Sequence, residues 1–433
     1  MAILAIILFL SIFLLILYGF PVAFTLGGLS ILYAVCFLDI SSFSAIPPRF
    51  MGIMSNYVLL AVPLFVFMGI MLEKSGIAER MLRTMAFLFG RLRGGLAISV
   101  VIVGALLAAS TGIVGATVVT MGLISLPTML KQGYSPELAT GTISASGTLG
   151  QIIPPSIVLI LLGSVMNVPV GDLFQAAIIP GIALVGIYIS YIIIKSFLDP
   201  KSAPPISEDA LKEFWSDKGV ALNILSSFLF PFLLIFLVLG SIIMGIATPT
   251  EAAAVGAIGA IILSAFNKKV NKKTLQDVSM ETMKLSSMIF FILLGATCFS
   301  FVFRALGGDE FLVQAISNSN MSSMAFLLIV MLIMFIAGFF IDFIEIIFIL
   351  VPVVVPIFIE YDTNLIWLGI LIALNLQTSF LTPPFGFALF YLKGVAPKSV
   401  KTASIYKGVI PFVIIQILFL LLLILFPNLI ISS

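Results

Sequence analysis

The chain has 433 residues, of which 61% are hydrophobic and 9% charged, and its formal net charge is +2. A soluble globule carries about 25% charged residues, so this chain has too little polar surface for water and fits a lipid environment. The small net charge argues against nucleic acid as a partner, and the absence of histidine removes the commonest ligand or base of zinc, haem and serine-triad sites.

Apolar runs long enough to cross a bilayer follow one another along the chain. We expect crossings at residues 2–19, 22–39, 56–73, 136–165, 172–195, 219–243, 249–266, 283–303, 365–391 and 408–428. Backbone groups in lipid must be satisfied internally, and the runs are continuously apolar, which favours helices over barrel strands. The first run lacks a basic n-region and a cleavage site, so we expect it to be retained as a span.

Four basic stretches separate these spans and set the expected orientation. They are Arg80–Arg93, Lys195–Lys218, Lys268–Lys284 and Lys393–Lys407. The positive-inside rule places all of them in the cytoplasm. The acidic pairs Asp309-Glu310 and Glu360-Asp362 then lie outside, as do both chain termini.

Two further apolar segments, 95–129 and 322–359, do not fit this alternation. Each is long enough for two short crossings, yet basic residues flank the first on both sides and acidic residues flank the second on both sides. We therefore expect two re-entrant hairpins, each entering and leaving on one face. Irregular backbone at membrane depth is tolerated only where protein or a water-filled cavity surrounds it, so a pair of hairpins predicts a site.

Prolines recur at one constant offset. Pro127 recurs as Pro356, and Pro154-Pro155 as Pro383-Pro384, in each case 229 residues later. Two prolines break a helix, free carbonyl oxygens for a hard cation and expose a helix N-terminus that suits a carboxylate. Inverted repeats with helices broken in matching places are the sequence pattern of secondary transporters. The alternative is that each pair is only a packing kink.

The hairpin tips and the two breaks supply the expected ligands. Hydroxyl and carbonyl oxygens would hold Na⁺ at Ser110, Thr111, Gly112, Gly150, Ile153, Gly338, Asp342, Thr378, Ser379 and Thr382. Substrate would contact Ser110, Gln151, Pro154, Pro155, Ser156, Asn375, Gln377, Pro383 and Pro384. The alternative is that these small and polar residues only pack or hydrogen-bond neighbouring helices.

A few charged residues within apolar runs allow two interpretations. Asp342 and Glu345 could assist a cation or carry protons, because an intramembrane carboxylate is a functional hypothesis by default, or they could be solvated at an exposed tip. Glu251 follows Thr248-Pro249 and is expected to cap a helix. Arg304 could bind a substrate carboxylate or extend toward the interface.

Ordered motifs run through nearly the whole chain and carry a family resemblance. They include Val62-Pro63-Leu64-Phe65, Gly90-Arg91-Leu92-Arg93-Gly94-Gly95, Ala109-Ser110-Thr111-Gly112, Thr248-Pro249-Thr250-Glu251 and Leu381-Thr382-Pro383-Pro384-Phe385-Gly386. These motifs resemble the large membrane subunit (DctM type) of the tripartite ATP-independent periplasmic (TRAP) transporters. Ser110-Thr111-Gly112 stands where many relatives carry Gly-Ser-Ser.

The resemblance implies an all-α polytopic membrane protein, an inverted-repeat elevator-type carrier with two re-entrant hairpins and two broken helices. The expected division of the chain is scaffold helices at 1–75, an amphipathic arm at 76–94, a first transport repeat at 95–165, scaffold helices at 172–303 with cytoplasmic loops 196–218 and 267–282, a second transport repeat at 322–391 and a C-terminal helix at 408–430.

The resemblance also implies partners and a coupling ion. Na⁺ would be the coupling ion, and no other cofactor is expected. The expected partners are a separate small four-helix membrane subunit (DctQ type), a periplasmic substrate-binding protein (DctP type), an organic-anion substrate and the lipid bilayer. The expected place is the inner (cytoplasmic) membrane of a bacterium or archaeon.

The leading hypothesis is therefore import of a small organic acid by Na⁺-coupled secondary transport. A self-sufficient Na⁺- or H⁺-coupled anion symporter of related design is the alternative, and a requirement for a binding protein separates the two. An intramembrane transferase would need an acidic pair or metal at the membrane surface, which the loop 195–218 lacks, and a channel does not need such hairpins. No GxxxxGK[ST] motif occurs, so the chain should not hydrolyse ATP.

Overall fold

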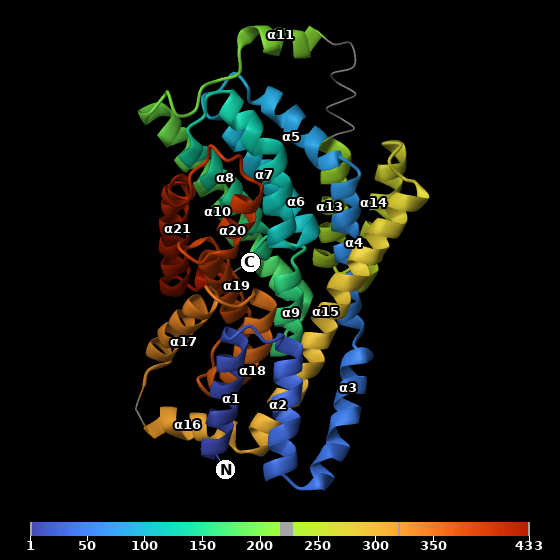
Figure 1. Ribbon diagram of the computed structural model, residues 1–433, viewed down its shortest axis with the longest axis vertical. Coiled ribbons are helices and arrows are strands. Elements are labelled where there is room, and N and C mark those ends of the chain that lie inside the picture. Colours follow the sequence, from blue (N-terminus) through green and yellow to red (C-terminus); the bar gives the residue numbers. More distant parts are fainter. Residues whose placement is uncertain (1, 217–227, 319–320, 432–433) are drawn as a thin grey trace.

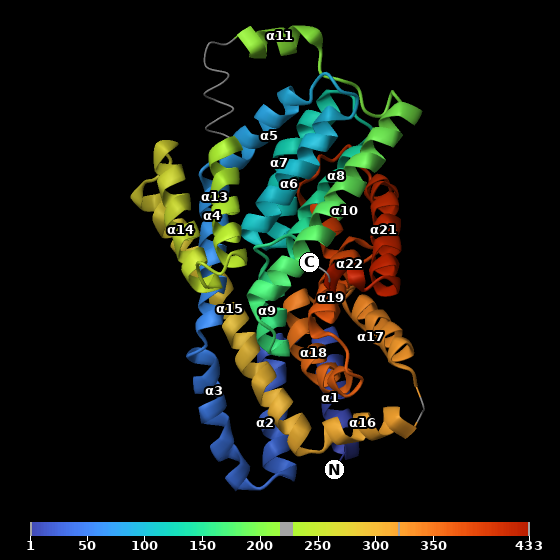
Figure 2. The same ribbon diagram turned by 180° about the vertical axis from the view of Figure 1, so that it is seen from behind.

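The computed structural model describes residues 2–216, 228–318 and 321–431, and all regular structure within those residues is helical (Figures 1 and 2). Seven of the described helices are long and apolar enough to cross a membrane. Shorter apolar helices accompany them, among them one helix of each hairpin, Gly95–Ala109 and Ser323–Ala337. The expectation of an all-α polytopic membrane protein is confirmed.

One set of helices, which we call the scaffold helices, comes from the start of each half of the chain. From the first half it contains α1 (Ala2–Leu17), α2 (Val22–Phe37), α3 (Ile46–Met54), α4 (Ala61–Lys74) and α5 (Ile77–Leu88), with short 3₁₀ turns η1 (Ile40–Ala45) and η2 (Tyr57–Leu60). From the second half it contains α13 (Phe230–Ile243), α14 (Pro249–Phe266), α15 (Lys272–Ala305) and α16 (Gly308–Asn318).

The other set, the repeat helices, contains the hairpins and the broken helices. The first repeat consists of hairpin helices α6 (Gly95–Thr111) and α7 (Val114–Lys131) and the broken helix α8 (Pro136–Thr148), η3 (Leu149–Gln151) and α9 (Ile157–Met166). We group with it the long α10 (Val170–Leu198), which the expected division counts among the scaffold helices. The second consists of α17 (Ser323–Ala337), α18 (Phe343–Glu360), the broken helix α19 (Leu365–Leu381) and α20 (Phe387–Val395), and α21 (Thr402–Leu425). Two short helices, α11 (Glu208–Ser216) and α22 (Asn428–Ile431), complete the description.

The repeat offset seen in the prolines holds for whole helices. α7 begins at Val114 and α18 begins at Phe343, 229 residues later. The caps of the broken helices match as well, because the side chains of Ser135 and Asn364 each accept a hydrogen bond from the amide three residues on. An asparagine and a serine are both good N-caps, so the two halves start this helix by the same physical means.

The two halves are inverted with respect to each other. The amphipathic helices α5 and α16 follow α4 and α15, and they lie at opposite ends of the molecule in both views (Figures 1 and 2). The helix packing is exchanged in the same way: α4 packs on α14 while α2 packs on α15, and α7 packs on α20 while α18 packs on α9. Each contact thus has a partner contact made by the equivalent helices of the other half.

Two expected loops are partly helical. Within 196–218 the structure contains α11, and residues 217 and 218 lie outside the described part, as do residues 219–227 of one expected crossing. The expected loop 267–282 is helical from Lys272 onward, because Asn271 accepts a hydrogen bond from the Thr274 amide at 2.8 Å and so caps α15. The polar first turns of α15 therefore continue directly into its apolar span.

Candidate transport site

The tip of the first hairpin packs against the second half of the first broken helix. α6 ends at Thr111, and Gly112 follows with φ +62°, its amide donating to the Ala108 carbonyl at 2.8 Å. A Cβ on Gly112 would stand 2.7 Å from Cγ1 of Ile157, the first residue of α9. Both the left-handed backbone and this close approach require glycine. Ser110 and Thr111 belong to α6, but their side chains lie outside the described part of the structure.

The first break lies against the same hairpin. A Cβ on Gly150 would overlap the carbonyl of Ala108, so the backbone of η3 packs directly on α6. Ser156 donates to the Gln151 carbonyl at 2.8 Å and accepts from the Leu159 amide, which makes it the cap of α9. The Gln151 side chain is fully buried, and neither of its amide atoms has a hydrogen-bond partner. Burying an unpaired amide is costly, so Gln151 is a side-chain candidate for contact with a polar substrate, as is Gln377, whose amide atoms are also buried without a hydrogen-bond partner.

Ile153 and Pro154 of the first break have apolar surroundings. Pro154 and Ile153 line an apolar crevice of about 550 Å³ between α6, α10 and α13. The following Pro154–Pro155 peptide bond is cis, as is Pro383–Pro384 in the second break. The side chain of Ile153 is apolar, so only its backbone carbonyl could serve as the expected ion ligand, and this role stays a prediction.

The second hairpin tip packs against the second break. A Cβ on Gly338 would overlap the side-chain oxygen of Ser379. The residue equivalent to Ser379 in the first repeat is Gly150, 229 positions earlier, so the same pairing of tip and break occurs in both halves. The structure thus brings Gly112 and Gly150 together at one tip, and Gly338 and Ser379 together at the other.

The acids of the second tip form a helix cap. Asp342 accepts a hydrogen bond from the Phe343 amide at 2.7 Å, and Glu345 accepts one from the Asp342 amide at 3.2 Å, which closes a capping box at the start of α18. This local role was not among the interpretations drawn from sequence for either acid. A similar box joins Thr248 and Glu251, so the expected capping role of Glu251 is confirmed.

Three hydroxyls at the end of α19 present their oxygens in a regular way. Thr378 donates to the Leu374 carbonyl at 2.7 Å, Ser379 to the Leu376 carbonyl at 2.8 Å, and Thr382 to the Thr378 carbonyl at 2.7 Å. Each hydroxyl proton is thereby used, whereas the oxygen lone pairs remain available. Oxygens of this kind are the neutral ligands that a hard monovalent cation prefers.

Asn375 and Gln377 point to different sides of α19. Two residues along a helix are turned by about 200°, so they cannot share a face. Asn375 donates to the Met331 carbonyl of α17 at 2.8 Å and so ties the broken helix to the hairpin. Gln377 lies beside Tyr188 of α10, whose hydroxyl accepts a hydrogen bond from Gln416 of α21 at 2.5 Å. The structure therefore separates Gln377 from the hairpin-facing residues of the second break.

Two remaining polar groups are occupied by neighbours. The Pro384 carbonyl accepts a hydrogen bond from the Tyr406 hydroxyl at 3.1 Å. Arg304 pairs with Asp309 at 3.0 Å, beyond the end of α15, where burial raises the pKa of the Asp309 carboxyl and the arginine counteracts that shift. Arg304 thus has an acidic partner within the chain.

The comparison with known proteins decides the family. A sequence profile of the tripartite ATP-independent periplasmic transporter, DctM component, matches residues 9–429. The chain belongs to the DctM family. It is the large permease component of a TRAP transporter and not an enzyme.

Curated relatives of this DctM protein align along nearly its whole length. It is 32% identical to the C4-dicarboxylate TRAP transporter large permease protein DctM of Vibrio cholerae, covering 93% of this chain and 91% of that one. It is 28% identical to the sialic acid TRAP transporter large permease protein SiaM of the same organism, covering 95% and 93%. Among solved structures, the YdaH transporter of Alcanivorax borkumensis has a TM-score of 0.65 at 15% identity, covering 96% and 98%, which supports the fold.

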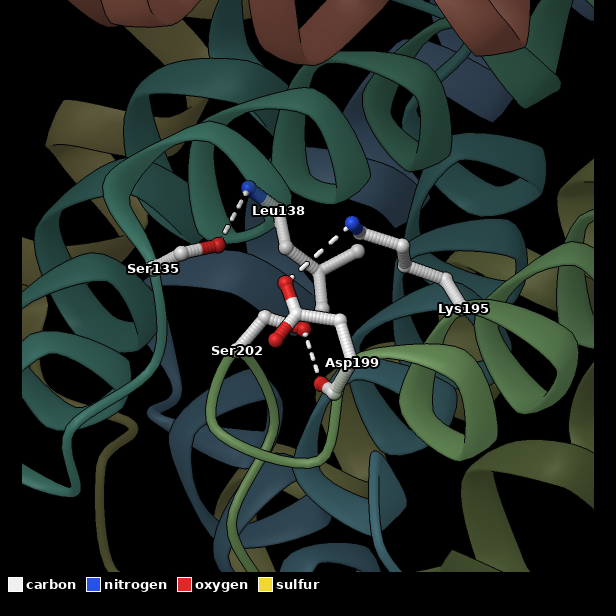
Figure 3. Close-up of polar contacts among 5 residues, drawn as sticks. All are labelled: Ser135, Leu138, Lys195, Asp199 and Ser202. Atoms are coloured by element: carbon white, nitrogen blue, oxygen red, sulfur yellow. Dashed lines mark hydrogen bonds and ion pairs between the residues drawn. The ribbon is translucent and has the colours of Figure 1, made fainter.

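In this DctM chain, one polar cluster ties the ends of α8 and α10 together (Figure 3). Ser135 accepts from the Leu138 amide at 3.3 Å, and its own amide donates to the Ser202 carbonyl at 3.0 Å. Lys195 pairs with Asp199 at 3.2 Å, and Ser202 donates to the Asp199 carbonyl at 2.7 Å. The loop after α10 therefore anchors the start of the first broken helix.

The buried pair Tyr188 and Gln416 was not predicted from the sequence. Both residues are polar within long apolar spans, and that was the available signal. Their positions differ by 228, one less than the repeat offset, so they lie at nearly equivalent places in α10 and α21. Their contact joins the two repeats of the DctM chain near their centre.

Proposed function

We propose that this chain is the translocating subunit that imports a small organic acid together with Na⁺. A periplasmic binding protein would deliver the acid, a small four-helix membrane subunit would stand beside this chain, and the assembly would lie in the bacterial inner membrane. The observation that carries the proposal is the matched pairing of each hairpin with a break, Ala108 with Gly150 and Gly338 with Ser379, in two inverted halves.

The breaks offer complementary ligands for the cation and the anion. Lone pairs of the Thr378, Ser379 and Thr382 hydroxyls, with freed backbone carbonyls, would hold Na⁺. The short helices α9 and α20 begin directly after the breaks, and their N-terminal partial positive charge would favour a carboxylate there. One place in the membrane would thus hold both ions, which is what coupling of their transport requires.

The names of relatives indicate the substrate class. Relatives are named for C4-dicarboxylates, sialic acid and isethionate, all of which are organic anions. Arg304, the basic residue considered from sequence, is held by Asp309. We therefore expect the anion to be bound by helix N-termini, by the Gln151 amide and by the charge of co-bound Na⁺.

The mechanism that fits the pseudo-twofold arrangement is an elevator. The repeat helices would carry the site past the scaffold helices, and the hairpins would open on opposite faces in turn. Packed interfaces exchange between discrete arrangements rather than deforming continuously, and two inverted halves offer two equivalent arrangements of the same contacts.

Uptake into proteoliposomes tests the proposal. The chain would be reconstituted with its small subunit, with and without the binding protein and with and without an imposed inward Na⁺ gradient. Uptake that requires both the binding protein and the gradient supports it. Uptake with Na⁺ alone favours the self-sufficient symporter, and uptake indifferent to Na⁺ removes the coupling.

A further inference from the structure

A hydrogen bond links the scaffold helices to the first hairpin. The Thr120 hydroxyl in α7 donates to the Glu73 carboxylate in the last turn of α4. α4 packs chiefly on α14 and α15, whereas α7 packs on α8 and α20, so the two residues come from different sets of helices. Both residues are half-buried.

The charges around Glu73 increase the stabilisation that this hydrogen bond gives to the carboxylate. The neighbouring Lys74 pairs with Glu281 of α15 at 2.6 Å, so the lysine is shared between two acids. A half-buried carboxylate without a hydrogen-bond donor is costly, and hydrogen bonds to charged groups are among the stronger ones. Moving α7 away from α4 would therefore remove a hydrogen-bond donor from Glu73.

The other half of the chain has no such polar pair at the equivalent place. The residues 229 positions after Glu73 and Thr120 are Val302 and Ile349, which lie in the contacting helices α15 and α18 and are both buried. If the two halves exchange contacts during a cycle, a polar link joins α4 to α7, whereas buried apolar residues stand at the equivalent places in α15 and α18. The two arrangements of the transport cycle then differ in free energy by the contribution of this hydrogen bond.

We propose that Glu73 is a positioning residue for transport, which holds the first hairpin against α4 in the arrangement described here and so sets the population of the two arrangements. The inference rests on the proposed elevator function. Glu73, which lies outside the hairpins and the breaks, thereby becomes a further determinant of that function.

Distance measurements between spin labels test the link. Labels on Leu123→Cys in α7 and Phe266→Cys at the end of α14, both at exposed positions, would report the separation of the two sets, with Cys36 replaced by serine. Thr120→Val keeps the shape and removes the hydroxyl, whereas Thr120→Ser keeps the hydroxyl. Thr128→Val in the same helix is a matched control, because the Thr128 hydroxyl bonds only within α7.

Thr120→Val and Glu73→Ala are each expected to raise the population of the other arrangement about tenfold, as loss of one charged hydrogen bond does. The double variant should go no further, and Thr120→Ser and Thr128→Val should match the unsubstituted chain. Equal distances between the spin labels in Thr120→Val and Thr120→Ser would overturn the proposed role of Glu73 and leave the elevator mechanism untouched. Distances in the unsubstituted chain that never respond to Na⁺ or substrate would overturn both the link and the elevator.

Discussion

At the scale of single residues, the second break is defined by hydroxyls whose protons are already used. Thr378, Ser379 and Thr382 each donate to a carbonyl of α19. The sequence predicted these residues as ligands from their position before Pro383-Pro384, and the structure supplies the regular orientation of their oxygens. Gln377 shows that nearness in sequence does not predict a shared face of the helix, since residues two positions apart point to opposite sides.

Removing one of these oxygens should weaken cation binding. We expect Thr382→Val to raise the Na⁺ concentration for half-maximal uptake about tenfold, the effect of losing roughly 1.4 kcal/mol of ligand interaction. Thr382→Ser keeps the oxygen and should behave as the unsubstituted chain. Sodium titrations of uptake in proteoliposomes measure this, and an unchanged half-maximal concentration in Thr382→Val would remove Thr382 from the site.

The glycine at the first tip should not tolerate a side chain. Gly112→Ala places a methyl group on left-handed backbone and 2.7 Å from Ile157, so it should lower stability by about 1–2 kcal/mol and abolish uptake. Gly186→Ala in α10 is the control, because no heavy atom lies within 4 Å of its added Cβ. Thermal unfolding and uptake check both variants, and full activity of Gly112→Ala would contradict the tip geometry.

At the scale of elements, the helices follow the hydropathy pattern, but their ends depend on caps. Expected spans such as 249–266 coincide with observed helices, because a run of apolar residues between charged loops has one stable conformation in lipid. The polar start of α15 was invisible to hydropathy, since Asn271 rather than burial begins that helix. Contacts between distant helices, such as Tyr188 with Gln416, cannot be paired from sequence, although each partner is marked as a polar residue within an apolar span.

The capping box at the second tip gives a clear expectation for Asp342. Asparagine is also a good N-cap, so Asp342→Asn should retain uptake and Na⁺ dependence. Asp342→Ala should lose about 1 kcal/mol of stability through the missing cap. Thermal unfolding combined with uptake separates the two roles: a stable Asp342→Asn variant without Na⁺ dependence would show that the carboxylate binds the cation.

At the scale of the whole molecule, a pseudo-twofold relation organises the fold. The recurring prolines predicted it for the hairpins and broken helices, and the structure extends the offset of 229 residues to the helices before them, as in the pair α5 and α16. Sequence identity between the halves is too slight to reveal this for apolar helices, whose residues interchange freely when they face lipid. The exchange of packing partners between the halves is visible only in three dimensions.

Labelling of both hairpin tips by a thiol reagent that cannot cross the membrane tests the inverted arrangement of the two halves most directly. Ile113→Cys and Phe340→Cys would be labelled separately, from each side, with and without Na⁺ and substrate. The account predicts that the two tips are reached from opposite faces and that conditions which raise labelling of one lower labelling of the other. Labelling of both from the same face, or a rise at both together, would contradict it.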